Sequence, residues 1–359
     1  MRPLEFGWYL PTHGDTTAYG LPEAQVPGSV ELCERVMQAA EKAGFEYLLI
    51  PVGSVCWEAW ITGAFMAARS GKIKPLIAAR PGYINPVLMA KMISTFDQMS
   101  GGRICINLIA GQNESEVEAE GVRHAKEERY ALMEEEVSIL KALWSTRGPV
   151  HFDGKFHKIS GAFIRPRPQQ VPHPKFYLGG GSRQAWELSA KHSDVHLFWG
   201  DLPEKIAANI SEIRQLARAH GRENEIGFGM RLQVICREDE KEAWDAAGQL
   251  VRHATERQKQ EMQTLYNKSE ANMRVQQLAR EHGDLLMPHL WTGITKVRPG
   301  AGIAVVGNPE QCASTLQQFI DAGCHSFCLS GYLHDEEAER FGRLIRPILA
   351  ENNRGRLAA

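Results

Sequence analysis

The chain has 359 residues, 43% of them hydrophobic, and its 41 Lys and Arg residues against 43 Asp and Glu give a formal net charge of −2. A chain of this length can bury a large core without disulfides or a structural metal. Near-neutral charge with dispersed basic residues is atypical of nucleic-acid binders, and no apolar run reaches the roughly 18 residues of a membrane span. The seven cysteines form no CxxC pair, which indicates unpaired thiols in a reducing compartment. The N-terminal stretch turns polar too early for a signal peptide. We therefore expect a cytoplasmic protein with no metal, membrane or nucleic-acid partner.

Eight short β-rich runs alternate with helical patterns along the chain. Several are apolar throughout, as is typical of strands buried on both faces of a parallel sheet. The predicted strands cover residues 4–10, 47–52, 74–80, 103–110, 175–180, 195–200, 227–236 and 326–332, and the clearest helical patterns cover 29–44, 85–102, 127–144, 182–192, 203–221 and 308–323. Eight strand–helix repeats predict one α/β domain over residues 1–359, a closed (β/α)₈ TIM barrel. No GxGxxG turn follows the first strand, which argues against an open dinucleotide-binding sheet.

Two stretches depart from this rhythm. Residues 149–168 alternate polar and apolar side chains around Asp153-Gly154, which predicts a β-hairpin inserted before strand five. Residues from about 237 to 302 form a long, polar, helical insertion after strand seven, too long for an ordinary connection. Its glycine-rich end carries Arg298, and we expect it to act as a mobile lid.

Active sites of such barrels form at the carboxyl ends of the strands. Polar residues or glycines stand at nearly every predicted strand end, in chain order His13, Cys56, Arg80, Asn107, Gly179, Gly180, Gly181, Ser182, Trp199, Arg231, Gln233, Tyr332 and His334.

Two features point to anion binding. "YLGGGSRQAWEL" places three glycines and Ser182 at a strand-to-helix junction, where backbone N–H groups can bind a phosphate. Arg231 and Arg298 in one pocket would bind a carboxylate, phosphate or sulfonate. The alternatives are a tight turn with no ligand and arginines held in salt bridges.

The remaining candidates allow plainer interpretations. Cys56 fits a buried thiol that packs as a small hydrophobic group. His13 and His334 fit capping or core hydrogen bonds as well as pocket roles. The sequence has no HxH, HExxH or GxSxG motif, which disfavours a zinc site and a serine hydrolase.

A series of motifs resembles the bacterial luciferase-like flavin monooxygenases, and within them the alkanesulfonate monooxygenases. In chain order they are "WYLPTHGD", "LLIPVGSVCWEAW", "RPGYINP", "MSGGRICINLIAG", "ERY", "FYLGGGS", "WGDLPE", "FGMRLQVICRE" and "LSGYLHDEE". They span roughly residues 4 to 350, and "PTHGD", "RPGAG" and "SGY" followed by His334 are the segments most similar to the sulfonate branch.

The resemblance implies a two-component enzyme. A separate NAD(P)H-dependent flavin reductase would supply reduced FMN, and O₂ would be the co-substrate. The carbon–sulfur bond of a small-molecule sulfonate would be cleaved to give sulfite and an aldehyde. The resemblance also implies a homodimer or homotetramer.

The resemblance assigns roles residue by residue. The flavin phosphate would meet Gly179, Gly180, Gly181 and Ser182, with Tyr130 nearby. Asn107 and Ala110 would lie near the flavin ring, and Cys56 close to it. Arg231 and Arg298 would bind the sulfonate, with Trp199 beside it. Tyr332 would take part in proton transfer, and His13 and His334 would be pocket histidines.

The sequence departs from the family pattern at two positions. Gln233 stands where the family usually has histidine, and an amide cannot exchange a proton near neutral pH as an imidazole can. Trp57 replaces an acidic residue after the cysteine and offers a flat stacking surface. Together they favour a polar, sugar-like sulfonate such as sulfoquinovose. Which residue compensates for the histidine stays open.

The sequence also fits two other functions. One is a monooxygenase of the same superfamily acting on a sulfone, a nitrogen heterocycle or a chelator. The other is a flavin-binding relative without desulfonating activity.

Overall fold

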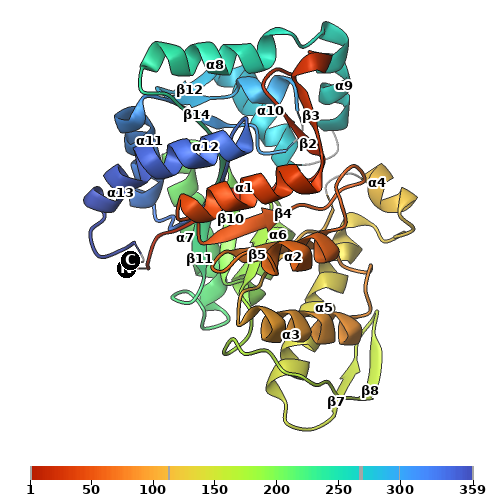
Figure 1. Cartoon of the computed structure of the whole chain (residues 1–359). Helices are drawn as coiled ribbons and strands as arrows, with labels where there is room; N and C mark the ends of the chain where they lie inside the picture. The colour runs from red at the N-terminus through yellow and green to blue at the C-terminus, as the bar shows by residue number, and fades with distance from the viewer. Residues whose placement is uncertain (1, 112–113, 267–269, 299, 358–359) are drawn as a thin grey trace.

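The computed structural model describes residues 2–111, 114–266, 270–298 and 300–357. Its centre is a closed barrel of eight parallel strands (Figure 1). In chain order these are β1 (Glu5–Tyr9), β4 (Tyr47–Ile50), β5 (Lys74–Ala79), β6 (Cys105–Leu108), β9 (Phe176–Gly179), β10 (Val195–Trp199), β11 (Gly227–Cys236) and β15 (Ser326–Ser330). The eight predicted strands are therefore confirmed, and the pairing of β1 with β15 and of β10 with β11 completes the closed circuit.

Helices surround the barrel. They are α1 (Val30–Lys42), α2 (Ala59–Ala67), α3 (Pro86–Ser100), α4 (Glu114–Ala119), α5 (Lys126–Ser145), α6 (Arg183–His192), α7 (Pro203–Arg218), α11 (Pro309–Asp321), α12 (His334–Arg340) and α13 (Arg346–Asn352). Their limits follow local signals: the Ser29 hydroxyl accepts the Leu32 N–H at the start of α1, and Gly101 ends α3 in the left-handed conformation. No helix in the described part of the chain is both long and apolar enough to cross a membrane.

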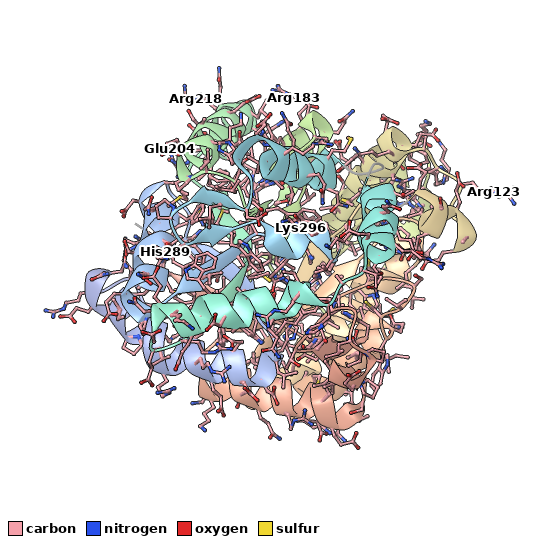
Figure 2. The ribbon with its side chains drawn as sticks, turned by 90° about the horizontal axis from the view of Figure 1, so that it is seen from above. Arg123, Arg183, Glu204, Arg218, His289 and Lys296 are labelled. Atoms are coloured by element: carbon pink, nitrogen blue, oxygen red, sulfur yellow. The ribbon has the colours of Figure 1, made fainter. Side chains whose placement is uncertain are left out.

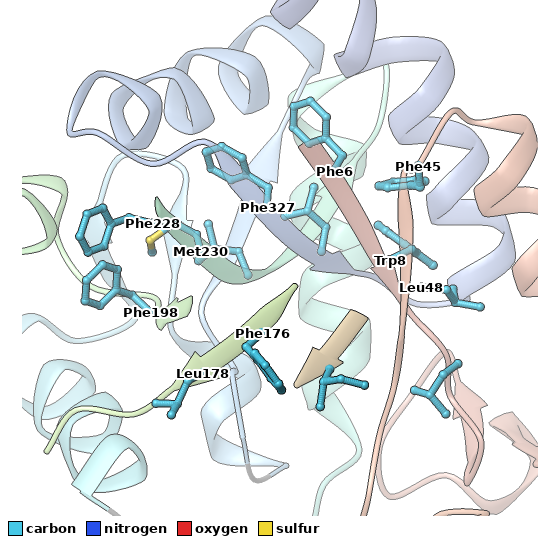
Figure 3. Close-up of a cluster of buried hydrophobic side chains, with 14 of the residues drawn as sticks. Phe6, Trp8, Phe45, Leu48, Phe176, Leu178, Phe198, Phe228, Met230 and Phe327 are labelled. Carbon is cyan, nitrogen blue, oxygen red and sulfur yellow. The ribbon is translucent and has the colours of Figure 1, made fainter. Parts of the chain in front are cut away.

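The core has two layers because successive side chains on each strand point to opposite faces. The outer layer fills the space between strands and helices and includes Phe6, Trp8 and Phe327 (Figure 3). The inner layer fills the barrel and includes Tyr47 and Tyr177, whose rings lie 5.5 Å apart. Space for Tyr47 comes from Gly7, where a Cβ would lie 1.9 Å from the Tyr47 ring.

Two small β-structures leave the barrel. β7 (Val150–Asp153) and β8 (Lys158–Ala162) form the expected antiparallel hairpin before β9. β2 (Gly14–Thr16) and β3 (Gln25–Pro27) form a second hairpin after β1, which the sequence did not predict. These strands have three residues each, too short to show an alternating pattern.

The insertion after β11 is only partly the helical segment we expected. It contains α8 (Glu240–Arg252), α9 (Glu256–Tyr266) and α10 (Glu270–His282), then β12 (Leu285–Met287), β13 (Leu290–Trp291) and a 3₁₀ turn η2 (Gly293–Lys296). β12 and β13 join β14 (Ala304–Gly307), which pairs with the second half of β11 and extends the sheet beyond the barrel. Figures 1 and 2 show the insertion over one end of the barrel, with Lys296 near the centre in the view from above.

Candidate functional site

A cavity of about 310 Å³ lies at the carboxyl ends of the barrel strands. Most of its walls come from the strand ends and the loops after them, and the insertion contributes a further wall through Ala271, Arg298, Gly300 and Ala301. The sequence-predicted residues that line it are Cys56, Asn107, Ala110, Tyr130, Gly179, Gly180, Gly181, Ser182, Trp199, Arg231 and Arg298. The polar strand ends therefore do converge, as the barrel topology requires.

Arg231 reaches the cavity because of its place on β11. Phe228, Met230 and Leu232 belong to the outer core, so the alternating residues Arg231 and Gln233 face the barrel interior. Burial lowers the pKa of Arg231, but a guanidinium stays charged in any protein environment. A permanent positive charge is thus built into the cavity wall.

The hydrogen bonds of Arg231 leave one edge of its guanidinium for a ligand. Nη1 donates to the Leu232 carbonyl at 3.0 Å, to the Cys328 carbonyl at 3.4 Å and to the Ser330 hydroxyl at 2.9 Å. Among the described residues, no carboxylate lies within ion-pair distance of Arg231, and its Nε and Nη2 make no hydrogen bond. That edge has the fork geometry that binds two oxygens of a carboxylate, phosphate or sulfonate.

Arg298 enters the same cavity from the insertion. It follows η2 and donates from Nη1 to the Tyr332 hydroxyl at 2.6 Å. Tyr19, on the β2–β3 hairpin, also donates to that hydroxyl, at 2.8 Å. Burial alone would lower the pKa of Arg298, but Tyr332 and Tyr19 raise it above its usual value. The insertion, the β2–β3 hairpin and the segment after β15 therefore meet at the oxygen of Tyr332.

The glycine turn between β9 and α6 forms another part of the cavity wall, two strands away from Arg231 on β11. Gly180 has φ +142°, and a Cβ there would lie 2.9 Å from the Ala185 Cβ and 3.4 Å from the Tyr130 hydroxyl. A Cβ at Gly181 would meet nothing within 4 Å. The Ser182 hydroxyl caps α6 by accepting the Ala185 N–H, which leaves its own proton to donate. This turn and the first N–H groups of a ten-residue helix can bind a phosphate.

The loop after β6 is held by Arg129 of α5. Its guanidinium donates to the Ala110 carbonyl at 2.7 Å and to the His124 carbonyl at 2.8 Å, and it pairs with Glu114 at 3.0 Å. Asn107, at the end of β6, and Ala110 therefore have fixed positions along one side of the cavity. In the same region Arg80 pairs with Glu116 and Glu120 and attaches α4 to the barrel. Arg80, one of the arginines that the sequence places at a strand end, is thus paired with carboxylates.

Cys56 and His13 lie on loops near the cavity. Cys56 lines it, and burial raises the pKa of its thiol, which favours the protonated form over a nucleophilic thiolate. His13 does not line it. The residue is partly exposed, and its ring stands 6.5 Å from the ring of Tyr9, which does; burial lowers the pKa of His13 to about 4.

His334 and Tyr332 lie behind the cavity rather than in its wall. His334 is buried, and its Nδ1 lies 2.9 Å from Asp15 Oδ2, which also accepts the His334 backbone N–H. Burial alone would raise the pKa of Asp15, but His334 and its backbone N–H hold it below its usual range. The rings of Tyr332 and His334 meet edge to face at 5.1 Å. The His334–Asp15 pair therefore lies next to Tyr332, the residue that Arg298 contacts.

Two residues expected to contact substrate do not line the cavity. Gln233 is completely buried, and its amide bonds to Ser330 and to the Ala301 carbonyl. Trp57 is 39% exposed on the loop before α2. The structure therefore gives no support for direct substrate contact by either residue, because sequence position near a strand end does not specify whether a side chain faces the cavity, the core or solvent.

Sequence reasoning also missed several residues of the site. Tyr9 lines the cavity at the end of β1, and the Arg231 guanidinium lies 5.0 Å over its ring. Its signal was available, since it alternates with the core residues Phe6 and Trp8. Ser330 could have been found the same way on β15. Arg129 and Tyr19 gave no such signal, because they come from a helix and a short hairpin.

Comparison with known proteins agrees with this architecture. The family model described as luciferase-like monooxygenase matches residues 4–326. A riboflavin lyase solved with modified FMN and riboflavin has a TM-score of 0.80 at 18% identity, over 99% of this chain and 93% of that one. EDTA monooxygenase from Chelativorans sp. BNC1 has a TM-score of 0.78 at 16% identity, over 98% and 94%.

A third solved structure shows how widely the fold is used. Coenzyme F420 dependent tetrahydromethanopterin reductase from Methanopyrus kandleri has a TM-score of 0.68 at 17% identity, over 97% of this chain and 99% of that one. At such identities the structural likeness shows the fold alone. The family model covers most of the sequence, and on that ground the chain belongs to the luciferase-like monooxygenase family and is a flavin-dependent monooxygenase.

Proposed function

We propose that this chain is a two-component monooxygenase that uses reduced FMN and O₂ to cleave the carbon–sulfur bond of an organosulfonate. The observation that carries the proposal is the free guanidinium edge of Arg231, buried in the cavity with no carboxylate partner among the described residues. A sulfonate stays anionic throughout the physiological pH range, and two of its oxygens match the two N–H groups of that edge.

The reaction balances with one O₂ and one reduced flavin per sulfonate. The carbon–sulfur bond breaks and a carbon–oxygen bond forms at the same carbon, so that the products are an aldehyde and sulfite. One oxygen atom enters the aldehyde and the other leaves as water. When bound, FMN supplies the two electrons and the activation of O₂ that this chemistry requires.

The glycine turn is our candidate for holding the FMN phosphate. Gly181 and the first turn of α6 present N–H groups, the Ser182 hydroxyl can donate, and Tyr130 stands beside Gly180. Asn107 and Ala110 would then flank the flavin ring, with Cys56 nearby as a neutral thiol. The turn follows β9 and Arg231 lies on β11, two strands away, so the two anions would bind at separate places on the cavity wall.

The two arginines would bind the sulfonate from different parts of the fold. Arg231 is fixed on the barrel, whereas Arg298 arrives with the insertion and would close over the ligand and exclude water. Trp199 lines the same cavity and would contact the organic part.

Tyr332 and His334 are our candidates for moving a proton. The Tyr332 oxygen accepts from Arg298 and Tyr19, so its own proton remains to be donated. His334 stands behind it with Asp15. His13, exposed beside Tyr9, would act at the cavity mouth.

The preference for a sugar-like sulfonate loses its support. It depended on Gln233 and Trp57 contacting the substrate, and neither lines the cavity. We therefore propose the organosulfonate class without a preference between alkyl and sugar chains.

A sulfite-release assay tests the proposal. The chain would be supplied with a generic NAD(P)H-dependent flavin reductase, NADH, FMN and O₂, and offered octanesulfonate, methanesulfonate, taurine and sulfoquinovose. We expect sulfite from at least one of them, and loss of most of that activity in Arg298→Ala. No sulfite from the panel, together with turnover of a sulfone or a chelator such as EDTA, would place the chain with a different substrate class.

A further inference from the structure

We infer that Gln233 is a positioning residue, which fixes the orientation of the Arg231 guanidinium and ties it to the segment carrying Arg298. The inference rests on the proposed function in so far as Arg231 binds an anion. It assigns to Gln233 a role through other residues, with no contact to substrate or flavin.

The barrel register places the participants next to one another. Gln233 pairs with Ser330 across β11 and β15, and Arg231 pairs with Cys328 one step below. All four side chains point into the barrel interior by the same alternation. Gln233 and Ser330 are completely buried, so neither can exchange its hydrogen bonds for water.

The hydrogen bonds that link Arg231 to Ser330, Gln233 and Ala301 form one continuous chain, in which each donor and acceptor is defined. Arg231 Nη1 donates to Ser330 Oγ at 2.9 Å, and Ser330 Oγ donates to Gln233 Oε1 at 2.6 Å. Gln233 Nε2 donates to the Ala301 carbonyl at 3.0 Å. A guanidinium can only donate and a carbonyl can only accept, so each proton in this chain has one possible position.

Position 233 must therefore present an acceptor to one neighbour and a donor to the other. A primary amide does this at every pH at which the protein is folded. An alkyl side chain would leave the Ser330 proton and the Ala301 carbonyl unsatisfied in the core, which is costly. It would also free Ser330 to rotate, and Arg231 Nη1 would lose its directed acceptor.

The far end of the chain reaches the insertion. Ala301 lies three residues after Arg298, and both line the cavity. The Gln233 amide thus connects the arginine fixed on the barrel with the segment that brings the other arginine. If Gln233 is lost, both guanidinium groups lose a restraint, and anion binding weakens although no ligand contact has been removed.

This role also answers the question of what replaces a histidine at position 233. A neutral imidazole offers one acceptor and one donor, as the amide does. The position then needs no acid or base, and no other residue has to compensate.

The test measures anion affinity separately from turnover, using the full chain with oxidised FMN and inorganic sulfate as the probe. We expect Gln233→Leu to raise the sulfate dissociation constant about tenfold, because Ser330, the acceptor that orients the Arg231 guanidinium, would no longer be held in place. The FMN dissociation constant should stay within about twofold, since the phosphate would bind at the other wall. With a turned-over sulfonate, KM should rise more than kcat falls.

Three further variants distinguish positioning from general damage. Gln233→His should restore sulfate affinity at pH 8, where the imidazole is neutral. Ser330→Ala should weaken sulfate binding as Gln233→Leu does. The double variant should bind sulfate little more weakly than either single variant, because both substitutions break the same series of hydrogen bonds. Gln170→Leu is the control: its amide donates to the carbonyl of buried Ile104, just before β6, at 2.8 Å, and to Asp97 Oδ1 at 2.7 Å, both at the opposite end of the barrel.

The outcomes are distinct. Wild-type sulfate affinity in a folded Gln233→Leu overturns the inference, as does an equal loss in Gln170→Leu. If Gln233→Leu does not fold, Ser330→Ala and Gln233→His decide in the same way. If Arg231→Met binds sulfate like the wild type, Arg231 is not an anion site and the inference is wrong. Loss of sulfate affinity in Gln233→Leu, with no sulfite from any sulfonate in the wild type, supports the inference and overturns the proposed function.

Discussion

Arg129 and Arg231 line the same cavity and are both buried, but their surroundings differ. Arg129 pairs with Glu114 and donates to two main-chain carbonyls, so its guanidinium is bound on several edges. Arg231, which lines the cavity, donates only from Nη1 among the described residues, and its other edge makes no hydrogen bond to them. Two buried arginines at one cavity can thus have different roles: Arg129 stabilises a loop, and Arg231 can bind an anion.

The reason is the fixed charge of a guanidinium. A buried group that can lose its charge does so when no partner is available, but arginine cannot. Arg129 satisfies the requirement with protein groups. Arg231 satisfies it only in part, so a bound anion would complete it.

The largest expected effect is that of Arg231→Met, which keeps most of the side-chain volume and removes the charge. We expect kcat/KM for the sulfonate to fall by about two to three orders of magnitude, as for the loss of a buried charged partner. FMN affinity should be almost unchanged, because the phosphate is expected at the other wall. Steady-state sulfite release and flavin fluorescence titration measure the two quantities. An equal loss of FMN affinity would contradict this separation of the two walls.

Arg129→Met should have the opposite signature. It removes the donor to the Ala110 and His124 carbonyls and breaks the Arg129–Glu114 ion pair, at a cost of about 2–4 kcal/mol. The urea midpoint should fall and proteolysis in residues 110–125 should accelerate. Sulfate affinity should be within about twofold of the wild type. If sulfate binding collapsed while the urea midpoint held, Arg129 would be the anion site and the comparison would reverse.

Glu136 shows how a buried group behaves when it can lose its charge. Its carboxylate accepts the Gly82 N–H at 2.9 Å and lies 3.4 Å from His157 Nε2, and burial raises its pKa from 4.5 to about 7. Because the folded pKa is raised, its contribution makes stability fall as pH rises from about 4.5 to about 7. Glu136→Gln should flatten this dependence and stabilise the protein at pH 8 by about 1–3 kcal/mol. Urea unfolding at pH 5 and pH 8 measures it, and an unchanged slope would count against a neutral Glu136.

Ser182→Ala tests the other wall of the cavity. The hydroxyl caps α6 and has a proton that it can donate to a phosphate, so its loss should weaken FMN binding about tenfold. Riboflavin, which lacks the phosphate, should bind the variant as it binds the wild type. Fluorescence quenching of both flavins measures this, and a similar loss for both would mean that Ser182 acts only as a helix cap.

The strands could be predicted from the sequence because their signal is local and repeated. Each of the eight runs is rich in apolar residues and lies between turn residues, and their number indicates a closed barrel. β12, β13 and β14 were not predicted, because strands of two to four residues gain their stability from the sheet they extend. The β2–β3 hairpin was missed for the same reason.

The site was predictable where a residue lies on a strand and less so elsewhere. Arg231 and the glycine turn could be placed in the cavity because the topology brings strand ends together. Arg298 could be associated with the site because it lies in the glycine-rich end of the insertion after strand seven, which we expected to act as a lid. The direction of a side chain in a loop is not encoded in its position, as Trp57 shows. Gln233 was placed at the right depth of the barrel, but its partners Ser330 and Ala301 come from segments far away in sequence.

The smallest expected effect is that of Trp57→Ala. Trp57 is 39% exposed and does not line the cavity, unlike Trp199, which does. We expect kcat/KM to change by less than about twofold for both octanesulfonate and sulfoquinovose, as is usual for a surface substitution away from the site. Trp199→Ala is the matched control, and its kcat/KM should fall with every sulfonate that is turned over. A selective loss of sulfoquinovose activity in Trp57→Ala would show that the loop before α2 folds over the substrate, and it would restore the interpretation of Trp57 as a sugar-stacking surface.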